Sequence, residues 1–276
     1  MTYVKEIIPS AQTLIGFIDL FKAVLDIRNK DPKRSFIDEE LFRITDFLIP
    51  TGQIGGINGA HSALFKFRFL FQDINILQNA KSPQINKWIK KLKKCPLQEY
   101  YGIRLEIHIA AFLTSKNIAF KCPDPPDFEI EWKSKTLKFE CTTRHLTASK
   151  NKEDVLKSFR TPIEKKSEKK KNYQFVDGNS ALLIECTNLS SHNAGLFWSE
   201  YEQTRKFLKQ EIELTKYGAV FTYSFIWNTS NGRYESIYSR IDSENINQDL
   251  TDFLDTFYPT GKHTVPPGHA YGSTVG

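Results

Sequence analysis

Three carboxylates stand at positions that the apolar pattern of the sequence does not explain. Glu106 lies in a stretch of helical period, Asp127 opens a strand-like run after two prolines, and Glu140 interrupts an apolar, threonine-rich run. Carboxylates that converge repel each other, and a proton or a cation relieves that repulsion. Mg²⁺ prefers oxygen ligands, and it can activate water and stabilise a phosphoryl group during in-line displacement. The three acids therefore point toward phosphodiester chemistry.

One helix and a hairpin are predicted to carry these acids. Residues 98–114 predict a helix in which Glu106 lies one residue from the apolar stripe. Three strands are predicted to follow, at residues 118–122, 127–132 and 136–143. A short polar segment separates the second strand from the third, which is typical of a hairpin. Alternation along the third strand places Lys138, Glu140 and Thr142 on one face.

This order of elements resembles the PD-(D/E)XK nuclease superfamily over roughly residues 97–225, with Pro126-Asp127 and Glu140 in the positions of its motif. The resemblance implies an α/β fold: a restriction-endonuclease-like αβββαβ core with a mixed central sheet, here preceded by a helical N-terminal region. It also implies an Mg²⁺- or Mn²⁺-dependent endonuclease that hydrolyses DNA, less often RNA, in restriction or defence. Asp127 and Glu140 would be catalytic metal ligands, and Glu106 an accessory ligand or a residue that orients metal-bound water.

One position departs from the superfamily's motif. The usual lysine, which helps to position and activate the attacking water, is replaced by Thr142. Thr142 could still hydrogen-bond a metal-bound water, and a lysine from a neighbouring element could take the missing role. A threonine–proline pair at Thr161 predicts a helix start. Lys166 and Lys170 share one face of that helix, so Lys166 is the first candidate, Lys170 the second and Lys138 the third.

Two other interpretations remain open. Thr142 in place of lysine is compatible with a catalytically inactive nuclease-fold module that binds nucleic acid or a protein partner. Alternatively, Asp127, Glu140 and Glu106 are ordinary surface acids of a metal-free α/β protein. The distance between the carboxylates separates these cases, because acids more than ~10 Å apart cannot share an ion with oxygen contacts of ~2–2.6 Å.

The net charge of +6 is unevenly distributed along the 276 residues. One acid-free stretch contains Lys81, Lys87, Lys90, Lys91, Lys93 and Lys94, and a second run contains Lys165, Lys166, Lys169, Lys170 and Lys171. Two such runs on either side of the acids suit salt-sensitive binding of a phosphate backbone, although a solvated helix face gives the same pattern. We expect Lys87, Lys90, Lys91, Lys94, Lys165 and Lys169 to contact nucleic acid. A homodimer is expected if both strands of a palindrome are cut.

Other classes are disfavoured by composition. Lys and Arg interrupt every apolar run before it reaches the length of a membrane span, and the first residues lack a signal-peptide layout. Four widely spaced cysteines predict neither a zinc site nor a disulfide framework. A cytoplasmic protein is expected.

The chain is predicted to have three parts. Residues 1–95 form a helical region, with helices at 11–27, 38–49, 60–78 and 84–94 and a glycine-rich turn at 50–59. Residues 96–242 form the nuclease core, continuing after the hairpin with a helix at 150–172, a buried strand at 180–187, a helix at 197–215, and antiparallel strands at 218–228 and 233–241. Residues 243–276 form a C-terminal helix and a flexible tail.

Overall fold

The computed structural model describes residues 11–27, 35–50, 54–144, 152–187, 201–228 and 233–260. The flexible tail predicted after the C-terminal helix lies outside these residues from Gly261 onward. The chain forms two compact units, Met1–Phe112 and Leu113–Gly276. No helix in the described ranges combines the length and the apolar character needed to cross a membrane.

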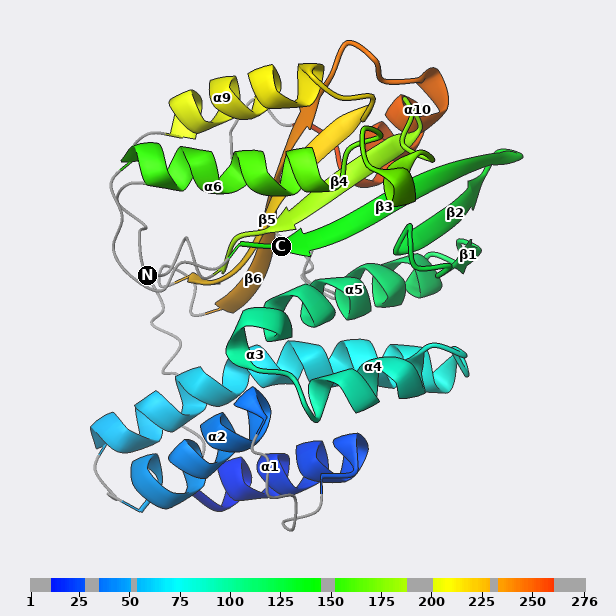
Figure 1. Cartoon of the computed structure of the whole chain (residues 1–276). Helices are drawn as coiled ribbons and strands as arrows, with labels where there is room; N and C mark the ends of the chain where they lie inside the picture. Colours follow the sequence, from blue (N-terminus) through cyan, green and yellow to red (C-terminus); the bar gives the residue numbers. More distant parts are fainter. Residues whose placement is uncertain are drawn as a thin grey trace, which may run out of the picture. The chain divides into compact units, whose positions relative to one another are not determined.

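The first unit is helical (Figure 1). Its elements are α1 (Ala11–Leu25), α2 (Phe36–Arg43), the π-helical turn η1 (Ile44–Leu48), α3 (Ile54–Asn79), α4 (Ile85–Leu92) and α5 (Leu97–Ser115), the last of these up to Phe112. Phe67 is fully buried, with its ring centroid 5.2 Å from that of Phe21 and 6.3 Å from that of Tyr100. Phe67 therefore belongs to the core of this unit.

The glycine-rich segment requires a correction. We predicted a turn at residues 50–59, but α3 already begins at Ile54 and includes Gly55, Gly56 and Gly59. Each glycine disfavours a helix by about 1 kcal/mol relative to alanine, a local cost that the tertiary packing of a long helix can outweigh. The later part of α3 supplies that packing through buried residues such as Leu70 and Ile74.

The second unit is an α/β domain built on one mixed six-stranded sheet. Its strands are β1 (Phe120–Lys121), β2 (Phe128–Trp132), β3 (Lys135–Thr143), β4 (Ser180–Glu185), β5 (Ala219–Asn228) and β6 (Arg233–Asp242), and they lie in the order of the sequence. β4 runs parallel to both neighbours, whereas the other pairs are antiparallel. Every residue of β4 is buried, as predicted for a central strand.

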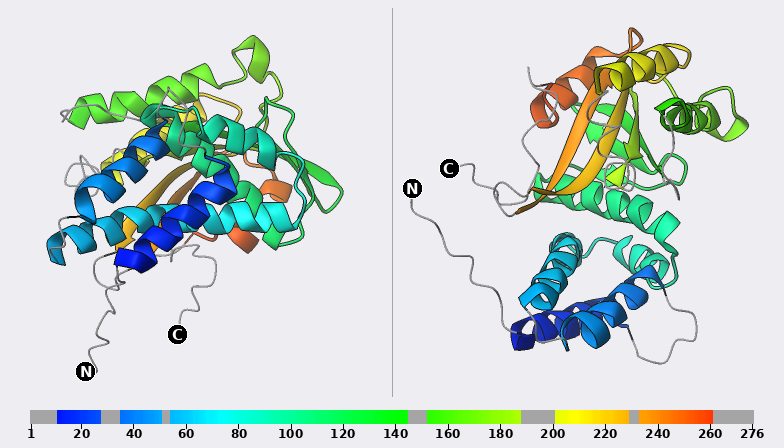
Figure 2. Two further views of the ribbon diagram at one scale, coloured as in Figure 1. Left: turned by 90° about the horizontal axis from the view of Figure 1, so that it is seen from below. Right: turned by 90° about the vertical axis from the view of Figure 1, so that its left-hand side faces the viewer.

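Helices cover both faces of this sheet (Figure 2, right). On one face, α6 (Lys152–Lys165) and α9 (Tyr201–Glu213) pack on β4 and β5, and Phe159 and Leu208 share a buried cluster with Leu182. On the other face, α10 (Gln248–Phe257) places Phe253 against Trp132 and Phe139, at ring-centroid distances of 5.3 Å and 5.7 Å. Glu140 is in register with Leu182, so its side chain belongs to the α6 face.

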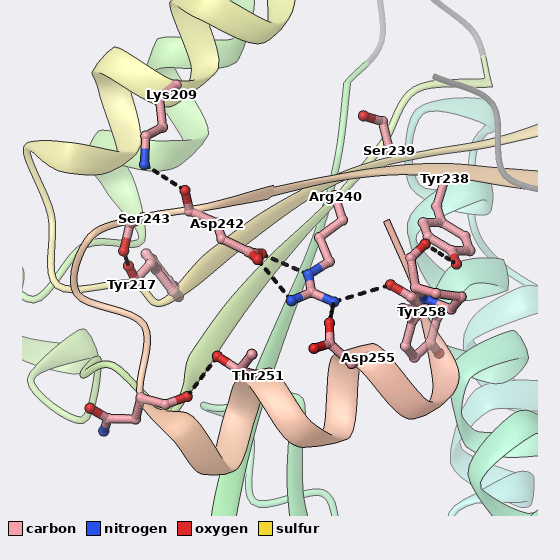
Figure 3. Close-up of polar contacts among 12 residues, drawn as sticks. Lys209, Tyr217, Tyr238, Ser239, Arg240, Asp242, Ser243, Thr251, Asp255 and Tyr258 are labelled. Atoms are coloured by element: carbon pink, nitrogen blue, oxygen red, sulfur yellow. Dashed lines mark hydrogen bonds and ion pairs between the residues drawn. The ribbon is translucent and has the colours of Figure 1, made fainter. Parts of the chain in front are cut away.

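A buried arginine fixes α10 to the edge of the sheet (Figure 3). Arg240 of β6 donates to both carboxylate oxygens of Asp242, each at 2.7 Å, and to Asp255 Oδ1 of α10, also at 2.7 Å. A further hydrogen bond reaches the main-chain oxygen of Tyr258 at 3.3 Å. Burial lowers the pKa of Arg240, but the two carboxylates outweigh burial and raise it, so the guanidinium stays charged. The helix is therefore part of the second unit.

The turn between β2 and β3 has two residues, because Trp132 pairs with Lys135. Both turn residues adopt left-handed backbone angles, with φ of 46° at Lys133 and 66° at Ser134. A two-residue loop with positive φ at both positions matches a type I′ turn, for which Asn-Gly is preferred. Lys133 forms a salt bridge with Asp252 at 3.0 Å, which a substitution would remove. Ser134 is therefore the turn residue at which a glycine can relieve the backbone strain.

We expect Ser134→Gly to raise the free energy of unfolding by about 1 kcal/mol, because glycine adopts positive φ without a Cβ clash. In a domain of this size, this corresponds to ~2–4 °C in Tm. Urea unfolding would measure the gain, with Ser134→Ala as the control that keeps the clash. Equal stabilities of the two variants would contradict the turn assignment.

Candidate active site

The hairpin brings Asp127 and Glu140 together. Asp127 directly precedes β2, and the pairing of Phe128 with Phe139 puts it opposite Glu140. The backbone N–H of Asp127 donates to Glu140 Oε2 at 3.3 Å, and the N–H of Cys141 donates to Asp127 Oδ2 at 2.7 Å. Each carboxylate is thus oriented by the other residue's strand, and the two acids meet at one point of the sheet.

Lys166 joins this pair from the end of α6. Its ammonium donates to Glu140 Oε1 in a short contact and to the main-chain oxygen of Cys141 at 2.8 Å. Lys166 follows the last residue of α6, and its N–H continues the helical pattern by donating to the Pro162 oxygen at 3.0 Å. Lys166, the first candidate for the missing motif lysine, therefore contacts the carboxylate of Glu140.

The local structure that delivers Lys166 differs from the prediction. We placed a helix start at Thr161, but α6 begins at Lys152 and contains Pro162 in its last turn. Val155, Phe159 and Ile163 are spaced by four and are buried against the sheet. The packing of this apolar stripe outweighs the hydrogen bond that proline cannot donate. Lys166 consequently lies at a helix C-terminus, where a cation is favoured by the helix dipole.

The site carries more negative than positive charge. Asp127 and Glu140 face the single ammonium of Lys166, and Glu140 is only 3% exposed. Burial raises the pKa of Glu140 first, the charge of Asp127 raises it further, and Lys166 opposes both, leaving the pKa at about 7. Burial alone would lower the pKa of Lys166, but Glu140 and Asp127 outweigh burial and raise it. Lys166 is therefore a charged donor at neutral pH, and the pair of acids is left to be neutralised by a proton or a cation.

Two tyrosines that the sequence analysis did not identify surround Lys166. Tyr173, in the 3₁₀ turn η2 (Lys171–Tyr173), places its hydroxyl 3.5 Å from Glu140 Oε1, and the Lys166 ammonium lies 5.8 Å from the centroid of its ring. Tyr217 is fully buried, and its hydroxyl donates to the main-chain oxygen of Lys166 at 2.8 Å. Tyr217 thus holds the backbone that carries the ammonium.

We expect Tyr217→Phe to lower the free energy of unfolding by about 1 kcal/mol, the usual contribution of one buried hydrogen bond. Because that bond fixes the Lys166 backbone, the same variant should also loosen the ammonium from Glu140. Tyr238→Phe is a matched control, since its hydroxyl donates to the Pro259 oxygen at 3.2 Å in another part of the unit. Urea unfolding measures the first effect, and NMR signals of the Lys166 side chain measure the second. Unchanged Lys166 signals would remove Tyr217 from the site.

The other lysine candidates do not contact the acids. Lys138 lies on the same face of β3 as Glu140, but its ammonium pairs with Asp177 at 2.8 Å and donates to the Phe175 oxygen at 2.9 Å. Lys170 is exposed. Lysines 165, 169 and 171 are exposed as well, at the end of α6 or in the residues that follow it. Of this run, Lys166 alone among the described residues turns inward to the carboxylates.

Thr142 lies two residues beyond Glu140 on the same face and is half-buried. The structure therefore puts a hydroxyl, rather than an ammonium, at the third position of the motif. The prediction that Thr142 hydrogen-bonds a metal-bound water stays a prediction.

Glu106 and the first lysine run belong to the other unit. Trp88 Nε1 donates to Glu106 Oε2 at 2.8 Å, and Lys91 Nζ lies 3.9 Å from the same oxygen. These contacts join α4 to α5. Lys87, Lys90 and Lys94 are exposed on α4 or directly after it. The role of Glu106 as a metal ligand and the role of these lysines in binding nucleic acid stay predictions.

The donor set at the site suits Mg²⁺ or Mn²⁺. Asp127 and Glu140 offer carboxylate oxygens. The main-chain oxygen of Cys141, which accepts a hydrogen bond from the Lys166 ammonium, is a further oxygen at the site. No cluster of three or more His, Cys, Asp and Glu side chains is arranged for a metal in the described part of the chain. Mg²⁺ is usually held by one or two carboxylates plus waters and substrate phosphates, so two acids are sufficient.

Comparisons with known proteins add no family to this description. The chain matches no protein-family model, no curated protein and no solved structure.

Proposed function

We propose that this chain is a metal-dependent endonuclease of the PD-(D/E)XK type, with a restriction-endonuclease-like core, and that it hydrolyses phosphodiester bonds in DNA. One observation supports the proposal above all others: Asp127 just before β2, Glu140 of β3 and Lys166 just after α6 converge on one point. The ammonium comes from a different segment than the strand that carries Glu140 and Thr142, which supports Lys166 as a substitute for the usual lysine of the motif.

Asp127 and Glu140 would hold Mg²⁺ or Mn²⁺. When bound, such an ion activates water and stabilises negative charge on a phosphoryl group. Glu140 also orients Lys166, because its Oε1 accepts from the ammonium. The raised pKa of Lys166 keeps this group protonated. Lys166 therefore acts by donating hydrogen bonds to the attacking water or to a phosphate oxygen, and not as a general base.

The exposed lysines at and after the end of α6 support a polyanionic substrate. Lys165, Lys169, Lys170 and Lys171 are exposed within six residues of Lys166. They would attract the phosphate backbone while Lys166 works at the scissile phosphate, and that attraction would weaken with salt. A small neutral substrate would gain nothing from these lysines.

The test is cleavage of supercoiled, linear and single-stranded DNA and of RNA, with Mg²⁺, with Mn²⁺ or with EDTA. Glu140→Ala, prepared identically, reveals any contaminating nuclease. Metal-dependent cutting that the variant lacks supports the proposal. Salt-sensitive binding without cutting, equal in both proteins, would instead favour an inactive module. Neither cutting nor binding with any substrate would reject a nucleic-acid function.

A further inference from the structure

Arg144 lies at the end of the strand that carries Glu140. Its backbone N–H donates to the Glu185 oxygen at 2.7 Å, so the pairing of β3 with β4 extends to this residue. Because side chains alternate along a strand, Glu140, Thr142 and Arg144 follow one another on the face that α6 covers. At ~3.3 Å per residue, Arg144 lies ~13 Å along the strand from Glu140.

No charge among the described residues balances that of Arg144. The side chain is half-buried, and its Nε is buried without a hydrogen-bond partner. Within the described ranges, no carboxylate pairs with its guanidinium. Its electrostatic neighbour is the thiol of Cys186, which is buried, and burial raises the pKa of that thiol well above its usual value. The neighbour is therefore neutral at physiological pH.

An unbalanced, half-buried arginine costs free energy in the absence of a ligand. Burial lowers the pKa of Arg144, which expresses this cost. Arg240, by contrast, is more deeply buried but is paired with Asp242 and Asp255. A site that keeps an unpaired guanidinium is suited to an anion from outside, and the planar fork of arginine fits phosphate oxygens in a bidentate arrangement.

We propose that Arg144 binds a phosphate group, supplied by the backbone of a nucleic acid that also reaches Glu140. This inference rests on the proposed function for the identity of the phosphate. Neighbouring phosphates along one strand are ~3.4 Å apart along the helix axis. The ~13 Å between the two residues therefore places the phosphate at Arg144 a few nucleotides from the scissile bond. Arg144 thus sets the register of the substrate on β3.

The experiment measures binding of a fluorescent duplex to the full chain without divalent metal, between 50 and 200 mM salt (that is, roughly the range in which phosphate contacts weaken). Arg144→Gln removes the charge, and Arg144→Lys keeps the charge but loses the fork. Lys206→Gln, at an exposed position of α9, removes the same charge elsewhere. A parallel arm follows Tm with added inorganic phosphate. Circular dichroism checks that each variant is folded.

We expect Arg144→Gln to weaken binding roughly tenfold and to reduce the slope of log K against log salt by about 0.9, with Arg144→Lys between it and the wild type. Lys206→Gln should match the wild type. In the phosphate arm, the wild type should gain Tm and Arg144→Gln should not. Removing an unbalanced charge should leave Arg144→Gln at least as stable as the wild type in the absence of phosphate.

The other outcomes separate the inference from the proposed function. If Arg144→Gln and Lys206→Gln bind the duplex as the wild type does, the assignment of Arg144 is overturned while the nuclease proposal stands. If no protein binds nucleic acid but inorganic phosphate raises the Tm of the wild type alone, the phosphate site is supported with a free phosphate as its source, and the nuclease proposal is weakened. The absence of both effects overturns the inference.

Discussion

Lys166→Ala is expected to lower the rate constant of metal-dependent cleavage at least ~100-fold, the usual loss when one donor to a developing charge is removed. Lys166 is the ammonium that contacts Glu140 and the Cys141 oxygen. Its pKa is raised, so the group is charged and positioned before any substrate arrives. The alanine variant lacks the hydrogen-bond donor, and it also leaves Glu140 without the ammonium that orients its carboxylate. Single-turnover cleavage with saturating enzyme would measure the loss directly.

Lys170→Ala is the matched control for this variant. It removes the same type of side chain four residues further along the chain, but Lys170 is exposed. We expect its single-turnover rate constant to stay within about threefold of the wild type, with any weakening confined to binding at high salt. If Lys170→Ala abolished cleavage and Lys166→Ala did not, the second sequence candidate would be the migrated lysine and the roles assigned here would be wrong.

A binding role for Lys166 would give a different result. If the ammonium only attracted the phosphate backbone, Lys166→Ala would raise KM and leave kcat unchanged. A loss confined to the rate constant at saturation identifies an interaction that strengthens in the transition state. Lys166→Arg adds a further distinction, because the planar guanidinium keeps the charge but cannot occupy the same point between Glu140 and Cys141.

The acids of the hairpin could be predicted because strand alternation is local. The two-residue turn sets the register, and register alone puts Asp127 opposite Glu140. The same local logic places Thr142 and Arg144 on that face, but the buried, unsatisfied Nε of Arg144 is visible only in the structure. Periodicity also predicted the succession of strands along the chain and the burial of β4.

What could not be predicted depends on contacts between distant segments. Tyr217 reaches Lys166 across 51 residues, and nothing in the sequence around either residue indicates that hydrogen bond. The threonine–proline pair at Thr161 was a misleading signal, because a buried apolar stripe carries α6 through Pro162. The contact of Lys166 with Glu140 is nevertheless compatible with the predicted helix face, since the helical phase of Lys166 relative to Ile163 is the same whether the helix begins or ends nearby.

The stabilisation of the protein by Mg²⁺ is expected to increase with pH between 6 and 8. Glu140 must be ionised to bind a cation, and its pKa is about 7. At pH 6 about one tenth of Glu140 is ionised and at pH 8 about nine tenths, so the apparent affinity for Mg²⁺ should rise roughly tenfold. The rise in Tm at a fixed Mg²⁺ concentration follows that affinity. Thermal unfolding with Mg²⁺ or EDTA at both pH values would measure it.

The metal-free protein should show the opposite dependence on pH. A glutamate whose pKa is higher in the folded state than in the unfolded chain holds its proton more tightly when folded. Its contribution to stability is therefore complete below the ordinary glutamate pKa and is lost as the pH rises through about 7. Glu140→Gln cannot titrate and should lose both trends, while Asp252→Asn, at an exposed position of α10, should keep them. If Mg²⁺ raised the Tm of the wild type equally at pH 6 and pH 8, the cation would bind elsewhere, and Asp127 with Glu140 would no longer qualify as its site.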